Sequence, residues 1–402
     1  MELLLPFFYL LIFILIIRKI PFFHDADLPR NFFIVVFIVK SLLGILYTRS
    51  FSGDDTYMYY DDARLFIYPT LFQNPLQFLY LTFAPNATAI PDFIRPHVMA
   101  MGYWGDTSDY MVVRFNAVAC LFSFGNFYVH PVFMAFVSLM GLVWLHRAYI
   151  FAAGGFSRAV AAAIFLIPSV LFWGSGVHKE GLLLFTLGLL LYGCVRLAEN
   201  LAVKNILFTI TGAVLTYFIR DYVLFMLLPG MLAFFLTSRN YIRIRFLPLI
   251  YVLIIAAGIL MPVFDGMNFA EAIAWKQQDF KTLEAGGTQI SVKNFHPTAI
   301  SLLNNLPQAL RNSLLGPFMI SAGNPLYLII MFENALLFLA AFLFPWITGR
   351  PRLQPFALMC LLFSFSLLIL IGYIVPNVGA IVRYRSIALP FLFIFLYSGK
   401  KR

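Results

Sequence analysis

Charged residues are scarce in this chain, which excludes most classes of soluble protein. Asp, Glu, Lys and Arg make up 11% of its 402 residues, whereas an ordinary soluble domain carries roughly 25%. The three cysteines lie in apolar stretches without pairing or metal-ligand spacing, which argues against a disulfide scaffold. The sequence also lacks a glycine-rich phosphate loop, Gly-x-Ser-x-Gly and His-Glu-x-x-His. These absences argue against nucleotide-driven transport, serine hydrolysis and zinc proteolysis.

Apolar residues, in contrast, make up 61% of the chain, and 46 of them are phenylalanine. A water-soluble core of this size cannot hold so many, so the composition predicts an all-α polytopic membrane protein. The net charge of +10 is explained by basic cytoplasmic loops better than by nucleic acid binding. We therefore expect membrane lipids, and no nucleic acid, among the partners of this chain.

Apolar runs of spanning length recur along the whole chain, so we expect a single transmembrane domain over residues 1–402. A helix needs about 20 apolar residues to cross a bilayer, and the chain holds about eleven such runs. The segment 109–125 is apolar but carries Arg114 and Asn116, and we count it as not crossing. The predicted spans lie at about 2–18, 31–48, 130–147, 157–174, 181–197, 203–219, 222–238, 246–263, 325–347, 354–375 and 386–398.

The basic residues between these spans fit one alternation, which places their loops in the cytoplasm. The opposite, extracytoplasmic side then receives two long polar segments, 49–110 and 264–323. Both contain helix-like stretches, for example 270–283 and 300–314, which we expect to lie as interfacial helices on the membrane surface. The elaborated face of the protein is therefore predicted to be the outer one.

The first of these segments opens with four carboxylates within nine residues. Asp54 and Asp61 are seven residues apart, as are Asp55 and Asp62, so each pair shares one face of a helix. A desolvated carboxylate at a membrane mouth acts as a general base toward a hydroxyl. We take Asp54 and Asp55 as catalytic candidates, and Asp61, Asp62 and Tyr57 as substrate-binding candidates. The alternative is a capped helix N-terminus with acidic residues in its first turn.

A divalent cation is compatible with this acidic cluster, because carboxylates bind hard cations. No spacing in the sequence assigns its ligands, and no other cofactor is indicated.

Two further groups of charged residues occupy connections predicted to lie close to the outer membrane surface. His178, Lys179 and Glu180 follow a short turn, and Arg220 and Asp221 separate two predicted spans. Charges at this depth are costly unless they are paired or solvated. We take all five as substrate-binding candidates, with Lys179 and Arg220 as phosphate ligands. Glu180 would orient Lys179 or His178, and Asp221 would orient Arg220. Snorkelling side chains or a structural ion pair would also account for them.

A third group, Arg383-Tyr384-Arg385, opens the last predicted span from its outer end. The positive-inside rule disfavours arginine on this side, and an anionic lipid headgroup would explain its presence. Because the guanidinium fork matches phosphate oxygens, Arg383 and Arg385 are candidate phosphate-binding residues. Ordinary lipid contact is the alternative.

The arrangement resembles the GT-C superfamily of polytopic glycosyltransferases, which carry catalytic acids in the first extracytoplasmic loop. The matching residues would be Gly53-Asp54-Asp55, and the segments 173–180 and 383–390 look similar to those of bacterial members. The resemblance implies a polyprenyl-phosphate-linked sugar donor, a glycan or glycolipid acceptor and inversion at the sugar. It also implies a bacterial cytoplasmic membrane with the active site facing the periplasm. One departure is the additional span predicted before the acidic loop.

Two rival interpretations remain open at this point. A Wzy-type oligosaccharide polymerase would depend on the arginines more than on the acids. A secondary transporter or lipid flippase would place ionisable residues in mid-membrane, where only Lys40 and Glu333 are predicted to lie. The sequence specifies neither the sugar nor the acceptor nor the oligomeric state.

Overall fold

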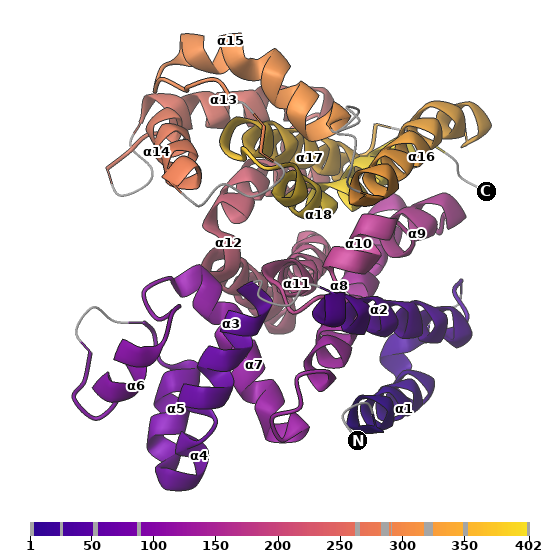
Figure 1. Cartoon of the computed structure of the whole chain (residues 1–402). Coiled ribbons are helices and arrows are strands. Elements are labelled where there is room, and N and C mark those ends of the chain that lie inside the picture. The colour runs from indigo at the N-terminus through magenta and orange to yellow at the C-terminus, as the bar shows by residue number, and fades with distance from the viewer. Residues whose placement is uncertain are drawn as a thin grey trace. The chain divides into compact units, whose positions relative to one another are not determined.

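The computed structural model describes residues 4–24, 27–50, 55–86, 90–261, 266–282, 289–290, 292–316, 325–348 and 353–399. Within these ranges the secondary structure is helical (Figure 1), apart from one isolated bridge between Gln289 and Asn377. The predicted all-α class is therefore confirmed for the described part of the chain. The ends of the helices match the predicted runs closely, since α1 covers Leu4–Lys19, α13 covers Leu247–Leu260 and α16 covers Pro325–Thr348.

Six of the helices in the described ranges are long and apolar enough to cross a membrane, as expected of a helical integral membrane protein. They are α2 (Arg30–Ser50), α8 (Val129–Ala153), α11 (Lys179–Glu199), α12 (Val203–Ser238), α17 (Pro355–Ile374) and α18 (Val378–Leu396). The predicted count of eleven spans stays a prediction.

The predicted span 157–174 is not one continuous helix. It divides into α9 (Arg158–Phe165) and α10 (Pro168–Trp173). Pro168 accounts for the interruption, because proline lacks a backbone N–H and disfavours helical conformation at the residue before it.

The helices group into two compact units. The first comprises residues 1–145, 171–193 and 207–221, and the second comprises residues 146–170, 194–206 and 222–402. The two units are described separately below.

In the first unit the polar segment 49–110 is folded into short helices rather than an extended loop. They are α3 (Asp55–Asp61), the π-helical turn η2 (Asp62–Ile67), α4 (Thr70–Gln73), α5 (Pro75–Phe83) and α6 (Arg95–Ala100). The following helix, α7 (Thr107–Ser123), packs against α3, η2 and α5. Tyr60, Ile67, Phe78 and Tyr110 are buried in the core that these helices share. The described part of this segment, which includes Asp55, Asp61 and Asp62, is thus folded against α7.

Helices α8 and α11 of this unit approach each other at two glycines. A Cβ atom on Gly188 would lie 2.0 Å from the carbonyl oxygen of Gly141, so the backbones are in direct contact. Small residues allow such close packing in membrane proteins. This contact fixes α11, which begins with the predicted site residues Lys179 and Glu180.

The second unit is built around α17 and α18, which pack against each other. The predicted surface helices of the second polar segment are present as α14 (Phe269–Thr282) and α15 (Ala299–Leu310), and both pack on α17. Gln277 of α14 joins these parts, since its side-chain amide donates to the carbonyls of Lys293 and Tyr373. A π-helical turn, η4 (Arg311–Leu315), follows α15, and the 3-10 helix η3 (Ile244–Phe246) precedes α13. The first unit contains a further 3-10 helix, η1 (Pro21–Phe23).

Candidate functional site

Two of the acidic residues of the first polar segment contact one tyrosine. The hydroxyl of Tyr103 donates to Oδ1 of Asp55 over 3.2 Å. The buried carboxylate of Asp62 accepts the backbone N–H groups of Tyr103 at 2.9 Å and Gly102 at 3.1 Å. Asp55 and Asp62 therefore contact the same residue, as expected for positions that share a helix face. Asp61 is exposed, and Asp54 lies outside the described residues.

Burial is the main cause of the raised pKa values in this cluster. It raises the pKa of Asp62, while the two backbone N–H donors act in the opposite direction. It also raises the pKa of Asp61, against the attraction of Arg64. The pKa of Tyr103 is raised first by burial and then by the charge of Asp55. Tyr103 is therefore a protonated donor that holds Asp55 as an acceptor.

Lys179, the first residue of α11, has a carboxylate partner that the sequence analysis missed. Its ammonium lies 2.8 Å from Oδ1 of Asp109 and 2.9 Å from Oγ of Ser108. The hydroxyl of Tyr59 donates to the same Asp109 oxygen. The sequence places Asp109 at the edge of the apolar segment 109–125. The signal that could have identified it is the helix-start pattern Asp106-x-x-Asp109, in which Asp106 caps α7 by accepting the N–H of Asp109.

Arg220 and Glu180 form a buried ion pair in the same unit, with Nη2 and Oε1 2.6 Å apart. The exposed fractions of the two side chains are 5% and 0%. The predicted break between two apolar runs falls at a kink in α12 (Val203–Ser238). Arg220 alone has extended backbone (φ −156°, ψ 96°) and forms a kink within the helix α12. Ser108 donates to the carbonyl of Ile219, directly before this kink. Asp221 is exposed.

The loop before α11 is anchored on α2. Lys40, fully buried, donates to the carbonyl of Gly174 over 3.1 Å. His178 is also buried, and its ring lies edge-on to Tyr47 with centroids 4.6 Å apart. These contacts fix the chain immediately before Lys179 and Glu180. The predicted role of His178 in substrate binding stays a prediction.

Tyr57 is half-buried rather than free on the surface. Its hydroxyl donates to the carbonyl of Thr48 over 2.8 Å, and its ring packs edge-on against Phe127. The first unit thus holds three groups of contacts: Asp55 and Asp62 with Tyr103, Lys179 with Ser108 and Asp109, and Glu180 with Arg220. Tyr59 joins the first two groups, because its hydroxyl donates to Asp109 and its ring centroid lies 4.6 Å from that of Tyr103.

The predicted arginines of the second unit lie within a helix, not in a loop before it. Helix α18 begins at Val378, because the side chain of Asn377 caps it by accepting the N–H of Ala380. Arg383 is half-buried with its guanidinium 5.2 Å from the ring centroid of Tyr384. Arg385 is 2% exposed and donates to the carbonyl of Gly316 at 3.1 Å and to the side chain of Asn334.

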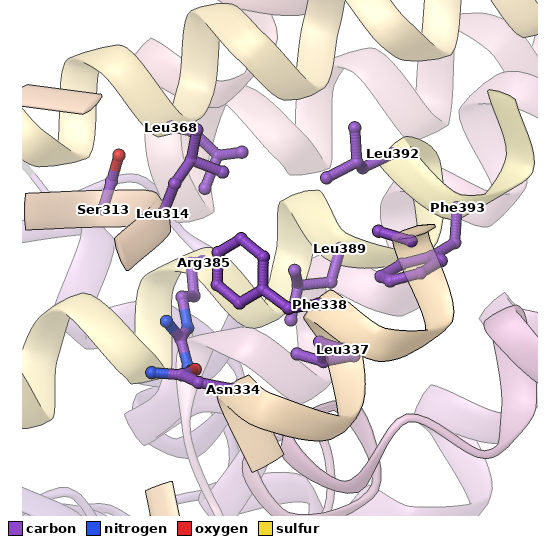
Figure 2. Close-up of a pocket in the computed structure, with 11 residues that line it drawn as sticks. Ser313, Leu314, Asn334, Leu337, Phe338, Leu368, Arg385, Leu389, Leu392 and Phe393 are labelled. Carbon is purple, nitrogen blue, oxygen red and sulfur yellow. The ribbon is translucent and has the colours of Figure 1, made fainter. Parts of the chain in front are cut away.

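A small cavity adjoins Arg385 in this unit. Figure 2 shows Arg385 and Asn334 directed toward each other beside Phe338 and Leu337. The cavity has a volume of about 60 Å³. Its lining is apolar except for three side chains, and comprises Ser313, Leu314, Asn334, Leu337, Phe338, Ala341, Leu368, Arg385, Leu389, Leu392 and Phe393. One buried cation, Arg385, therefore lies beside a small apolar cavity.

Within the described ranges no three His, Cys, Asp or Glu side chains come close enough together to hold a metal ion. Asp54 was outside that search. The divalent cation therefore stays an expectation from the sequence.

No family model, no curated protein and no solved structure matches this chain.

Proposed function

We propose that this chain is a membrane glycosyltransferase that transfers a sugar from a polyprenyl-phosphate-linked donor to a glycan or glycolipid acceptor. One observation carries the proposal. Asp109 of the first polar segment pairs with Lys179 at the start of α11, and the adjacent Glu180 pairs with Arg220 at the kink of α12. Carboxylates beside cations, on long apolar helices, are what transfer from a lipid phosphate to a hydroxyl requires.

The reaction follows from the chemistry of these groups. Asp54 or Asp55 accepts the proton of the acceptor hydroxyl as its oxygen bonds to the anomeric carbon of the sugar. The bond from that carbon to the phosphate oxygen breaks, and its electron pair leaves with the polyprenyl phosphate. Lys179 and Arg220 stabilise the negative charge that develops there. Attack from the side opposite the phosphate inverts the anomeric centre.

The proposal includes the membrane topology of the sequence analysis. About eleven spans would place 49–110 and 264–323 outside, in the cytoplasmic membrane of a bacterium with the site facing the periplasm. The cavity beside Arg385 supports contact with a lipid within the second unit. The remaining candidates, His178, Asp221 and Arg383, are proposed to bind substrate.

Secondary transport is a second candidate, favoured by one observation in the second unit. The carboxylate of Glu333 on α16 accepts the N–H of Ser169 over 2.7 Å, just after the interruption between α9 and α10. Interrupted helices with ionisable partners line the ion sites of many transporters.

The test compares lipid-linked glycans in cells that lack the protein. The cells are complemented with wild type, with the double variant Asp54→Asn, Asp55→Asn, or with the control Asp92→Asn. Asp92 lies in the same polar segment, and its side chain is 92% exposed. We expect an intermediate one sugar short, cleared by wild type and by the control but not by the double variant. Accumulated complete repeat units would indicate a polymerase, and an unchanged profile would indicate transport.

A further inference from the structure

The ammonium group of Lys179 is held from two sides by the first turn of α7. Oδ1 of Asp109 and Oγ of Ser108 lie 2.8 and 2.9 Å from its Nζ atom. The turn itself is fixed, because Asp106 accepts the N–H of Asp109 at 2.9 Å. A lysine side chain normally samples many rotamers, and two partners on one rigid turn remove most of that freedom.

The geometry leaves Lys179 one donor for a ligand. An ammonium has three N–H groups, and two of them are directed at Asp109 and Ser108. The side chain of Lys179 is 14% exposed, so the protein does not enclose it completely. A single fixed N–H suits one oxygen of a phosphate monoester, which is the leaving group of the proposed reaction.

Ser108 links Lys179 to the backbone next to the second cation, Arg220. Its hydroxyl accepts from Lys179 and donates to the carbonyl of Ile219 over 2.5 Å. Because a hydroxyl has one hydrogen, these two bonds fix its direction. Ile219 directly precedes Arg220, so the same side chain holds the backbone at the kink from which the guanidinium projects.

We infer that Ser108 and Asp109 are positioning residues that aim Lys179 at a phosphate oxygen and hold Arg220 beside it. This inference rests on the proposed function, in which both cations bind the phosphate of the donor. Asp109 acts through Lys179, and Ser108 acts through Lys179 and through the kink.

The first measurement needs no transfer activity. The full chain in detergent micelles is treated with N-acetoxysuccinimide, and acetylation of Lys179 is followed by mass spectrometry against the exposed reference Lys204. An amine held in an ion pair reacts slowly. We expect Asp109→Asn to raise the relative rate about tenfold, as the loss of a charge-assisted hydrogen bond implies, and Asp109→Glu to restore it. Ser108→Ala should raise the rate less, and Ser108→Thr should leave it unchanged.

The second measurement identifies the ligand. Farnesyl phosphate should protect Lys179 from acetylation in the wild type, whereas farnesol, which lacks the phosphate, should not. In Asp109→Asn we expect at least about fivefold more farnesyl phosphate to be needed for the same protection, because the third N–H is no longer aimed. Inorganic phosphate separates the contribution of the headgroup from that of the lipid chain.

Equal acetylation of Lys179 in wild type and in Asp109→Asn would overturn the inference, and so would equal protection by farnesol. If Asp109→Asn does not fold, Ser108→Ala and Ser108→Thr carry the same comparison. The outcome of the glycan experiment is independent of the outcome of the acetylation experiment. An unchanged glycan profile together with protection by farnesyl phosphate would reject the proposed transferase and leave the positioning of Lys179 intact.

Discussion

The buried ion pair between Glu180 and Arg220 gives the sharpest test of the first unit. Oε1 and Nη2 are 2.6 Å apart, and the side chains are at most 5% exposed. Removing one member of such a pair leaves the other charge buried without its partner, at a cost of about 3–5 kcal/mol. We therefore expect Glu180→Gln and Arg220→Gln each to lower the free energy of unfolding by about that amount. The double variant should cost less than the sum, with a coupling of about 2–3 kcal/mol.

The same helix, α11, offers a matched control. Arg196 and Glu199 form an ion pair of similar length, 2.8 Å, but their side chains are 28% and 48% exposed. Exposed pairs contribute about 0.2–1 kcal/mol, so Glu199→Gln and Arg196→Gln should be nearly neutral and nearly additive. Unfolding is measured by titrating SDS into detergent micelles and following tryptophan fluorescence. A coupling below about 1 kcal/mol for Glu180 and Arg220, equal to that of the control pair, would refute the buried geometry.

Three further predictions concern the same unit. Gly188→Ala should lower the melting temperature by several degrees because its Cβ would meet the carbonyl oxygen of Gly141, whereas Gly155→Ala, with no atom within 4 Å, should be neutral in the same melting assay. His130→Leu should cost about 2–3 kcal/mol in SDS unfolding, because it removes two buried hydrogen bonds of 2.6 and 2.9 Å at once. Burial raises the pKa of Asp62, so the folded state binds this proton more tightly and the contribution of Asp62 to stability declines as pH rises above about 3.9. A curve of melting temperature against pH should lose this component in Asp62→Asn.

The positions of most long helices could be predicted from the sequence, because long apolar runs mark them. The predicted runs 354–375 and 31–48 coincide with α17 and α2 within two residues at each end. The observed helices differ from the predicted runs where a single residue breaks or caps a helix. Pro168 divides the predicted span 157–174. Asn377 caps α18, which begins at Val378, eight residues before the predicted span 386–398.

The site was readable only in part, because pairing between distant residues leaves no local pattern. Lys179 and Arg220 stood out as charges next to apolar runs. Their partners Asp109 and Glu180 are 70 and 40 positions away along the chain. The sequence identified Glu180 through its neighbours, but it missed Asp109, whose own neighbours are ordinary helix-start residues.

The kink in α12 shows why tertiary contacts, rather than local sequence, determine this part of the site. Neither proline nor glycine occupies the kink, since Pro229 lies more than two turns further along. Kinks without these residues arise where another side chain enters the hydrogen-bond ladder of the helix. Ser108 does so at the carbonyl of Ile219, and the pair with Glu180 holds the guanidinium of Arg220 at the same place. Because α7 and α11 supply these two contacts, the interruption of α12 depends on residues that are remote in sequence. Ser108→Ala should therefore disturb the backbone conformation at Arg220.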